Sequence, residues 1–306
     1  MVKRIALFQS HIEIAGHVTA FITGKKFGDI HPGHGDDLFL ERLQKIRDAA
    51  SVAVPTPLFG PRVNHGKKIV SIYTSSDDTS LVKIPSKGRN ETPFTGVYRP
   101  HEECDAIITP HFEQSFGFFM ATADYPALLL YGKNAMGKGY FAFVHCSREC
   151  LVKGLIGLVI NEMTKLGCVP RELEAQTLPG IGPCCYGIGP DNAAELSEKQ
   201  LETIFLQRTQ ANGEYQKCQI GPRKGMISCN LPLGISNLVR KSGVASGGAR
   251  HFFCTCCSPD NYFSHSSGDD ERNGMFVFIA TPQQPVIGTT KIVPTRRSTL
   301  RFARSR

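Results

Sequence analysis

The fold is decided by residues 117–145, GFFMATADYPALLLYGKNAMGKGYFAFVH. Three apolar runs stand in this stretch, at 117–121, 127–131 and 140–145. Each run is short and is bounded by Gly, Pro or Asn, as buried strands are. The stretch therefore predicts three consecutive strands in the core of a sheet.

Helical patterns follow these strands. Residues 151–166 are mostly apolar and are followed by Gly167, which predicts one buried helix that ends there. Ser197 and Gln200 stand three residues apart as in a capping box, and predict the start of a second helix that stops near Gly213. Strands and helices in alternation indicate an α/β (α+β) chain, and 306 residues are enough to bury a sizeable core.

Five short motifs of this chain resemble, in order and in spacing, the conserved blocks of the YfiH family, which is also called the laccase-domain or polyphenol oxidase family. The resemblance covers roughly residues 35 to 280. The motifs are His65-Gly66, Thr122-Ala123-Asp124-Tyr125-Pro126, Val144-His145, Gly182-Pro183-Cys184-Cys185-Tyr186 and the block from Cys254 to Met275. The resemblance implies a YfiH-like fold of layered mixed β-sheets covered by helices.

The resemblance also implies a zinc site with two histidines and one cysteine. His65 and His145 match the histidines, but Tyr125 stands where the family has its cysteine. Three protein ligands leave a fourth position open, as catalytic zinc requires, and ligand type alone would equally suit copper. A phenol with a pKa near ~10 replaces a thiolate poorly. His145 is also explained as a hydrogen-bonded core residue, and both explanations stay open.

Further polar positions depart from the family pattern. Glu149 stands in place of an arginine that is suited to bind an anion such as phosphate. Ser266 and Ser267 replace a pair of arginines, and an alignment shifted by one residue would offer Arg148 and Arg272 as substitutes. Several such losses together indicate relaxed selection for the original chemistry.

Two functions from different classes follow. In the first, the chain is a catalytically degenerate family member that serves as an accessory or structural subunit of a larger assembly, such as an organellar ribosome or another ribonucleoprotein. In the second, it is a zinc-dependent purine nucleoside phosphorylase, acting on adenosine, inosine and methylthioadenosine with some deamination. That enzyme would need a rewired metal site, with Cys146, Cys150 or Cys256 as the replacement thiolate.

The 11 cysteines follow no disulfide framework and predict free thiols in a reducing, intracellular compartment, either cytoplasmic or organellar (mitochondrial). Cys184 and Cys185 are explained as small buried side chains. The Cys254–Cys257 cluster offers a soft ligand or strand-end packing, and packing is favoured because no second CxxC pair stands at zinc-finger spacing. No apolar run approaches the ~20 residues that span a bilayer, so no membrane partner is expected.

Two segments differ from the rest in composition. Residues 76–98 are polar and rich in Gly and Pro, and predict an exposed loop. We expect a single domain over 1–283 and a basic extension over 284–306. The extension holds six of the net +8 charges and no acid after residue 290, which predicts an arm that contacts RNA or a protein assembly, or simply a solvated end. Its basic residues are Lys291, Arg296, Arg297, Arg301, Arg304 and Arg306.

Overall fold

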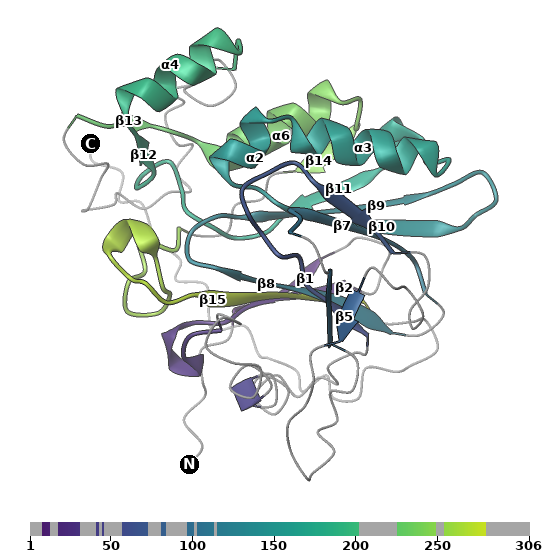
Figure 1. The fold of residues 1–306 in the computed structure, drawn as a ribbon, viewed down its shortest axis with the longest axis horizontal. Coiled ribbons are helices and arrows are strands. Elements are labelled where there is room, and N and C mark those ends of the chain that lie inside the picture. The colour runs from purple at the N-terminus through teal and green to yellow at the C-terminus, as the bar shows by residue number, and fades with distance from the viewer. Residues whose placement is uncertain are drawn as a thin grey trace, which may run out of the picture.

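The fold consists of two broad sheets stacked face to face, with helices on the outer face of one of them (Figure 1). This arrangement confirms the predicted layers of mixed sheets covered by helices. The computed structural model describes residues 8–12, 18–30, 41–42, 45, 57–72, 81–83, 97–100, 103–112, 115–201, 225–248 and 254–279.

The six-stranded sheet is built around an antiparallel hairpin, in which Phe143 lies opposite Leu129. This hairpin and the strand before it confirm the three strands predicted from residues 117–145. In spatial order the strands of this sheet are β14 (Ser246–Gly248), β11 (Glu174–Thr177), β9 (Ala127–Lys133), β10 (Gly139–His145), β7 (Ala106–Pro110) and β4 (Ile69–Ser71).

The seven-stranded sheet joins distant parts of the chain. Its strand β15 lies between β2 and β8 and is antiparallel to both. In spatial order the strands are β1 (Phe8–Ile12), β2 (Val18–Ile22), β15 (Asn273–Ile279), β8 (Phe116–Thr122), β3 (Leu58–Phe59), β6 (Val97–Pro100) and β5 (Leu81–Lys83). The prediction of a loop over 76–98 is thus wrong at β5 and at the first residues of β6, because their pairing with each other satisfies the backbone there.

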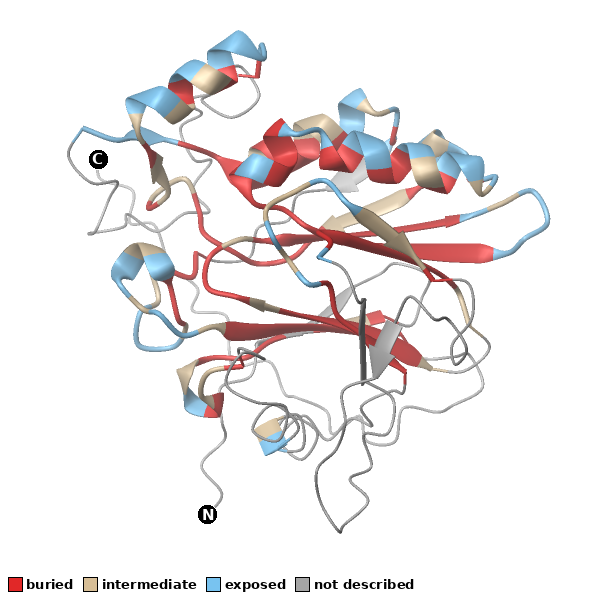
Figure 2. Ribbon diagram, in the orientation of Figure 1, coloured by how far each residue is buried: buried red, intermediate tan, exposed pale blue. Residues whose placement is uncertain are grey.

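Side chains alternate between two cores along the central strands. Phe141 and Phe143 point into the space between the sheets, whereas Ala142 and Val144 point toward the helices. The rings of Phe118 and Phe143 stack across the two sheets with centroids 5.3 Å apart. Each such buried ring contributes roughly 1.5–3 kcal/mol. Figure 2 shows these strands buried along nearly their whole length, so their ends are held rigidly in place.

The helices α2 (Arg148–Val152), α3 (Leu155–Lys165) and α6 (Leu231–Lys241) cover the outer face of the six-stranded sheet (Figures 1 and 2). The prediction of one helix over 151–166 is wrong, because Gly154 adopts a left-handed conformation at φ 81° and separates α2 from α3. Gly167, at φ 92°, ends α3 as predicted. None of the helices in the described part of the chain is long and apolar enough to cross a bilayer.

The prediction that a helix starts at Ser197 is wrong, because Ser197 belongs to α4 (Pro190–Glu198), and Gln200 follows that helix in a left-handed conformation at φ 55°. Pro190 occupies its first turn, a position where proline is favoured, and Ser197 lies in its last turn. Residues 202–224 lie outside the described residues, so the rest of the predicted helix stays a prediction. The described residues also form the small sheet β12 (Gly187–Ile188) with β13 (Ile227–Ser228), and the 3-10 helices η1 (Lys25–Phe27), η3 (Pro170–Glu172) and η4 (His265–Ser267).

Candidate functional site

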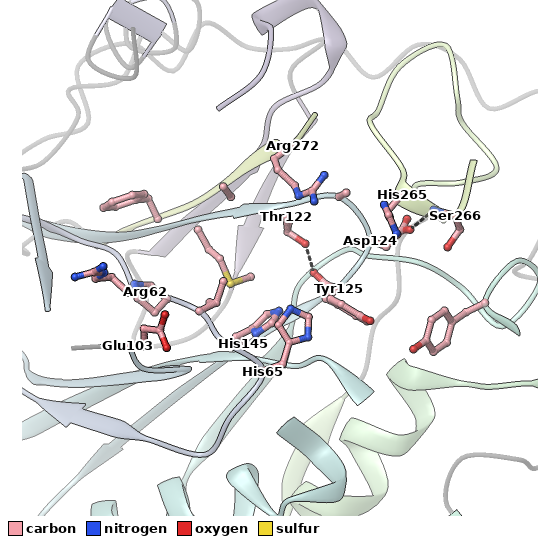
Figure 3. A pocket seen from close by; sticks show the side chains of 17 residues that line it. Arg62, His65, Glu103, Thr122, Asp124, Tyr125, His145, His265, Ser266 and Arg272 are labelled. Carbon is pink, nitrogen blue, oxygen red and sulfur yellow. Dashed lines mark hydrogen bonds between the residues drawn. The ribbon is translucent and has the colours of Figure 1, made fainter. Parts of the chain in front are cut away.

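A cavity of about 610 Å³ opens where β8 and β10 end. His145 is the last residue of β10, Tyr125 lies in the connection between β8 and β9, and His65 precedes β4. Figure 3 shows these three side chains together, with Arg62, Glu103, Arg272 and His265 around them. The structure thus brings together the three positions that the sequence motifs predict.

The three rings form a compact triangle. The centroids of His65 and His145 lie 5.2 Å apart, those of His65 and Tyr125 5.4 Å, and those of Tyr125 and His145 5.6 Å. All three pairs meet edge to face. Three rings in this arrangement pack stably against one another without an ion. Whether each side chain can bind a metal therefore depends on its protonation state.

His145 is held by a buried carboxylate. Its Nδ1 lies 2.9 Å from Oδ1 of Asp105, and both side chains are almost completely buried. A carboxylate only accepts hydrogen bonds, so in the neutral imidazole the proton sits on Nδ1 and the lone pair on Nε2. A carboxylate bound to one ring nitrogen in this way fixes the tautomer and the orientation of a histidine that binds a metal or transfers a proton through the other nitrogen.

Asp105 also organises the turn that carries His65. Its carboxylate accepts the backbone N–H groups of Asn64, His65 and Gly66 at 3.3, 3.1 and 2.7 Å. Burial pushes the pKa of Asp105 upward, but the hydrogen bonds from His145 and Gly66 outweigh it and hold the pKa below its ordinary value. Sequence reasoning missed Asp105, although an isolated acid at the start of the apolar run 104–108 was a signal for it.

His65 adopts a strained backbone conformation, with φ at 61°. Its Nδ1 lies 3.4 Å from Oε2 of Glu149, and its carbonyl oxygen accepts a hydrogen bond from Nζ of Lys153 at 2.6 Å. Burial, and then the nearby His145, lower the pKa of His65 below its ordinary value, although Glu149 acts in the opposite direction. The His65 imidazole is therefore mostly neutral at physiological pH.

Tyr125 is a protonated phenol. Its pKa is raised above the ordinary value chiefly by burial, with a smaller opposite effect from a hydrogen bond with Tyr186. The rings of Tyr125 and Tyr186 lie 6.2 Å apart, and both residues line the cavity. The position that the family resemblance assigns to a thiolate thus carries a neutral oxygen.

The described part of the cavity lining contains no cysteine. Sγ of Cys150 lies 3.8 Å from Nδ1 of His145, on the side of the ring that Asp105 occupies. Asp105, His145 and Cys150 are close enough to suggest a metal triad. However, Asp105 already accepts four hydrogen bonds, and burial raises the pKa of Cys150 to about 12, so we interpret the triad as a hydrogen-bond network. Cys146 and Cys256 are buried elsewhere.

The two arginines that a shifted alignment offers, Arg148 and Arg272, differ in their position relative to the cavity. Arg148 is buried and donates from Nη1 to Oε2 of Glu195 at 2.5 Å, outside the cavity lining. Arg272 lines the cavity. Of the serines in place of the paired arginines, Ser266 also lines it. Of the two substitute arginines, only Arg272 lines the cavity. The charged group beside His65 is the carboxylate of Glu149.

Asp124 lines the cavity and binds the segment that carries Ser266. Its Oδ1 accepts hydrogen bonds from Oγ1 of Thr255 at 2.9 Å and from Oγ of Ser264 at 2.7 Å, and its Oδ2 accepts the backbone N–H of Ser266 at 2.8 Å. Burial raises the pKa of Asp124 above its ordinary value. A motif residue adjacent to Tyr125 thus positions the C-terminal wall of the cavity.

The predicted RNA-binding residues of the C-terminal extension, Lys291, Arg296, Arg297, Arg301, Arg304 and Arg306, lie outside the described residues. The boundary predicted at residue 283 also falls there, so both stay predictions. The site itself is built entirely from described residues.

Comparisons with known proteins agree with the motifs. The family model described as multi-copper polyphenol oxidoreductase laccase matches residues 35–281. Similar folds occur in a DUF152-family protein of Neisseria meningitidis (15% identity, TM-score 0.59, covering 90% of this chain and 99% of that one) and in YfiH of Bacillus licheniformis (16%, 0.59, 86% and 92%). YlmD of Geobacillus stearothermophilus is equally similar (15%, 0.59, 90% and 100%). A search among curated proteins gave no match.

Proposed function

Because this chain belongs to the multi-copper polyphenol oxidoreductase laccase family, in which YfiH-like folds occur, we propose that it is a member without the metal-dependent catalysis of an intact site. In this proposal the fold serves as an accessory or structural subunit of a larger assembly, and a ribonucleoprotein such as an organellar ribosome is the kind of assembly that the basic extension favours.

One observation carries the proposal: a neutral phenol stands at the third corner of the ring triangle. Zinc and copper sites in proteins use chiefly imidazole, thiolate, thioether or carboxylate ligands. The imidazoles of His145 and His65 are ligands of the kind that such an ion takes. Tyr125 is not, because burial raises the pKa of its phenol above the ordinary value. The donor set therefore does not fit a three-ligand catalytic ion.

The charge next to the triangle supports the same proposal. Glu149 places a carboxylate 3.4 Å from Nδ1 of His65, where the family resemblance implies an arginine. A carboxylate repels an anionic co-substrate such as phosphate, whereas an arginine would bind it in a fork. Arg148 does not compensate, because its guanidinium is buried against Glu195.

The alternative, a zinc-dependent purine nucleoside phosphorylase with a rewired site, has one observation in its favour. The Asp105–His145 pair is intact, and the cavity of about 610 Å³ lies in the size range of ligand pockets, roughly 300–1,000 Å³. Besides the two imidazoles, this enzyme would need a third ligand, and that ligand would have to be anionic. None of Cys146, Cys150 and Cys256 lines the cavity. The ligand would have to come from an oxygen donor, either one in the cavity lining, such as Tyr125, or Glu149 beside His65.

Reintroducing the thiolate tests the proposal. The protein is equilibrated with zinc, its metal content is measured, and phosphorolysis of adenosine is assayed. The wild-type protein should show no turnover, and Tyr125→Cys should gain one zinc ion per chain that is lost again in Tyr125→Cys with His145→Ala. Turnover of the wild-type protein that His145→Ala abolishes would establish the enzyme and overturn the proposal.

A further inference from the structure

A second group of possible metal ligands lies outside the ring triangle. Cys184 and Cys185 belong to the turn before β12, and Cys254 and Cys257 belong to the segment that follows β14. The backbone holds the two segments together, because the N–H of Thr255 donates to the carbonyl oxygen of Gly180 at 3.2 Å. A vicinal pair and a CxxC pair about 70 residues apart thus meet in one cluster.

The four sulfurs are spaced as the ligands of one ion are. Sγ of Cys257 lies 3.4 Å from that of Cys184 and 3.5 Å from that of Cys185, and all four sulfurs lie within 4.8 Å of one another. Zinc–sulfur bonds of ~2.3 Å in a tetrahedron place sulfurs about 3.8 Å apart. A disulfide would need about 2.05 Å, and none of these four cysteines forms one in the structure.

The backbone around Cys254 favours a thiolate. The N–H of Gly182 donates to Sγ of Cys254 at 3.1 Å. Thiolate is the ligand form of cysteine, and a backbone donor that points at the sulfur stabilises that form.

Core packing explains only part of the cluster. Cysteines that act as small hydrophobic side chains are usually fully buried, as Cys146 and Cys150 are here. Cys185 and Cys254 are buried in the core in the same way, but Cys184 and Cys257 are only half-buried at its edge. A cluster with a sheltered inner pair and an accessible outer pair gives an ion an entry path.

We propose that Cys184, Cys185, Cys254 and Cys257 bind one zinc ion in a closed, tetrahedral, structural site. Four protein ligands leave no open position, so this site would stabilise the fold and take no part in catalysis. Binding converts the four thiols to thiolates, releases their protons, and leaves a net charge of −2 on the ion and its ligands. The proposal does not depend on the function proposed above.

Such an ion would join two walls of the cavity. The turn that carries Cys184 and Cys185 continues into Tyr186, which lines the cavity beside Tyr125. The segment that carries Cys254 continues into Thr255, which binds Asp124. Zinc at the cluster would therefore hold both segments in register while the ring triangle stays without an ion.

Metal content and substitution test the site in the full chain. Protein purified and incubated with zinc under reducing conditions should hold one zinc ion per chain. The double variant Cys184→Ala with Cys257→Ala should lose it, and Cys256→Ala, in the same run of sequence but outside the cluster, should keep it. The double variant His65→Ala with His145→Ala should also keep it, which separates this site from the cavity.

A spectroscopic measurement on the unmodified protein covers the case in which the cysteine variants fail to fold. X-ray absorption should show four sulfur neighbours at about 2.3 Å from zinc. Nitrogen or oxygen neighbours, zinc-free protein after incubation, or zinc content that Cys184→Ala with Cys257→Ala leaves unchanged would each overturn the proposal. Metal counts for the Tyr125→Cys experiment are made in the Cys184→Ala, Cys257→Ala background, so the two proposals fail independently.

Discussion

Asp105 and His145 share a buried hydrogen bond of 2.9 Å between Oδ1 and Nδ1, and the same carboxylate also holds the turn that carries His65. One side chain therefore positions both histidines of the ring triangle. This pair is as important for stability as for any chemistry, because an ionised carboxylate in the interior must have its hydrogen bonds satisfied.

We expect Asp105→Asn to lower the free energy of unfolding by about 3 kcal/mol, because the amide loses the charge that four donors share and presents its own N–H groups to them. Urea denaturation measures the change. Glu103→Gln is the matched control: Glu103 is exposed and accepts one bond from Nδ2 of Asn64, so its loss should stay within about 0.5 kcal/mol. Equal losses would contradict the role given to Asp105.

The stability difference between wild type and Asp105→Asn should depend on pH. The folded protein holds the pKa of Asp105 below its unfolded value, so the contribution is fully present above the unfolded pKa of about 4 and is lost as pH falls toward the folded pKa. Denaturation curves from pH 7 to pH 3 should show the difference shrinking below about pH 4. A constant difference would mean that the ionised form is not what the hydrogen bonds stabilise.

The left-handed backbone of His65 predicts an unusual order of substitutions. His65→Gly should be more stable than His65→Ala by about 1 kcal/mol, because φ near 61° strains every residue with a Cβ. Gln200, at φ 55°, should show the same order. Lys153 has φ −75° and should show the reverse, with alanine favoured. Thermal and urea unfolding of the six variants gives the comparison.

Gly180 is required where the motif turn approaches the loop of Tyr125. A Cβ there would lie 2.6 Å from the carbonyl oxygen of Asp124 and 2.7 Å from the backbone nitrogen of Pro126, and backbone atoms cannot move aside. Gly180→Ala should cost at least about 3 kcal/mol. Gly189→Ala, whose Cβ would meet nothing within 4 Å, should change stability by less than about 1 kcal/mol. Similar effects at both positions would show that the backbone at residue 180 has room for a Cβ beside Asp124 and Pro126.

Truncation at residue 283 tests the basic extension. If the six basic side chains contact RNA, removing them should weaken binding and flatten the dependence of log affinity on log salt by up to about 4–5, since each neutralised phosphate contributes ~0.7–0.9. Fluorescence anisotropy across a salt series measures both quantities. An unchanged slope would show that RNA contacts, if any, lie in the domain and not in the extension.

The sequence was most informative where chemistry and periodicity coincide. The apolar runs that became β8, β9 and β10 could be predicted because both of their faces are buried, and the ring triangle could be predicted because the motifs mark its corners. The division between α2 and α3 could not, since Gly154 within an apolar run is compatible with a continuous helix until tertiary packing selects the left-handed conformation.

The contacts between distant residues were beyond sequence reasoning. The cysteine cluster combines the vicinal pair Cys184–Cys185 with the CxxC pair Cys254 and Cys257. The criterion of two CxxC pairs at zinc-finger spacing therefore does not detect it. The hypothesis that Cys150 replaces the missing thiolate ligand met a similar difficulty. Cys150 lies close to His145 in space, but on the side of the ring that Asp105 occupies. Nothing in the sequence shows which side of a ring a neighbour contacts.

The position of β15 has a consequence for biosynthesis. Strands β2 and β8 are made long before the strand that lies between them, so during translation each keeps an unpaired edge until Asn273–Ile279 has emerged. Open edges of this kind invite pairing with other chains. A truncated mRNA that ends before codon 273 would therefore yield a product that lacks β15 and aggregates. The full-length nascent chain should depend on chaperones until β15 is inserted.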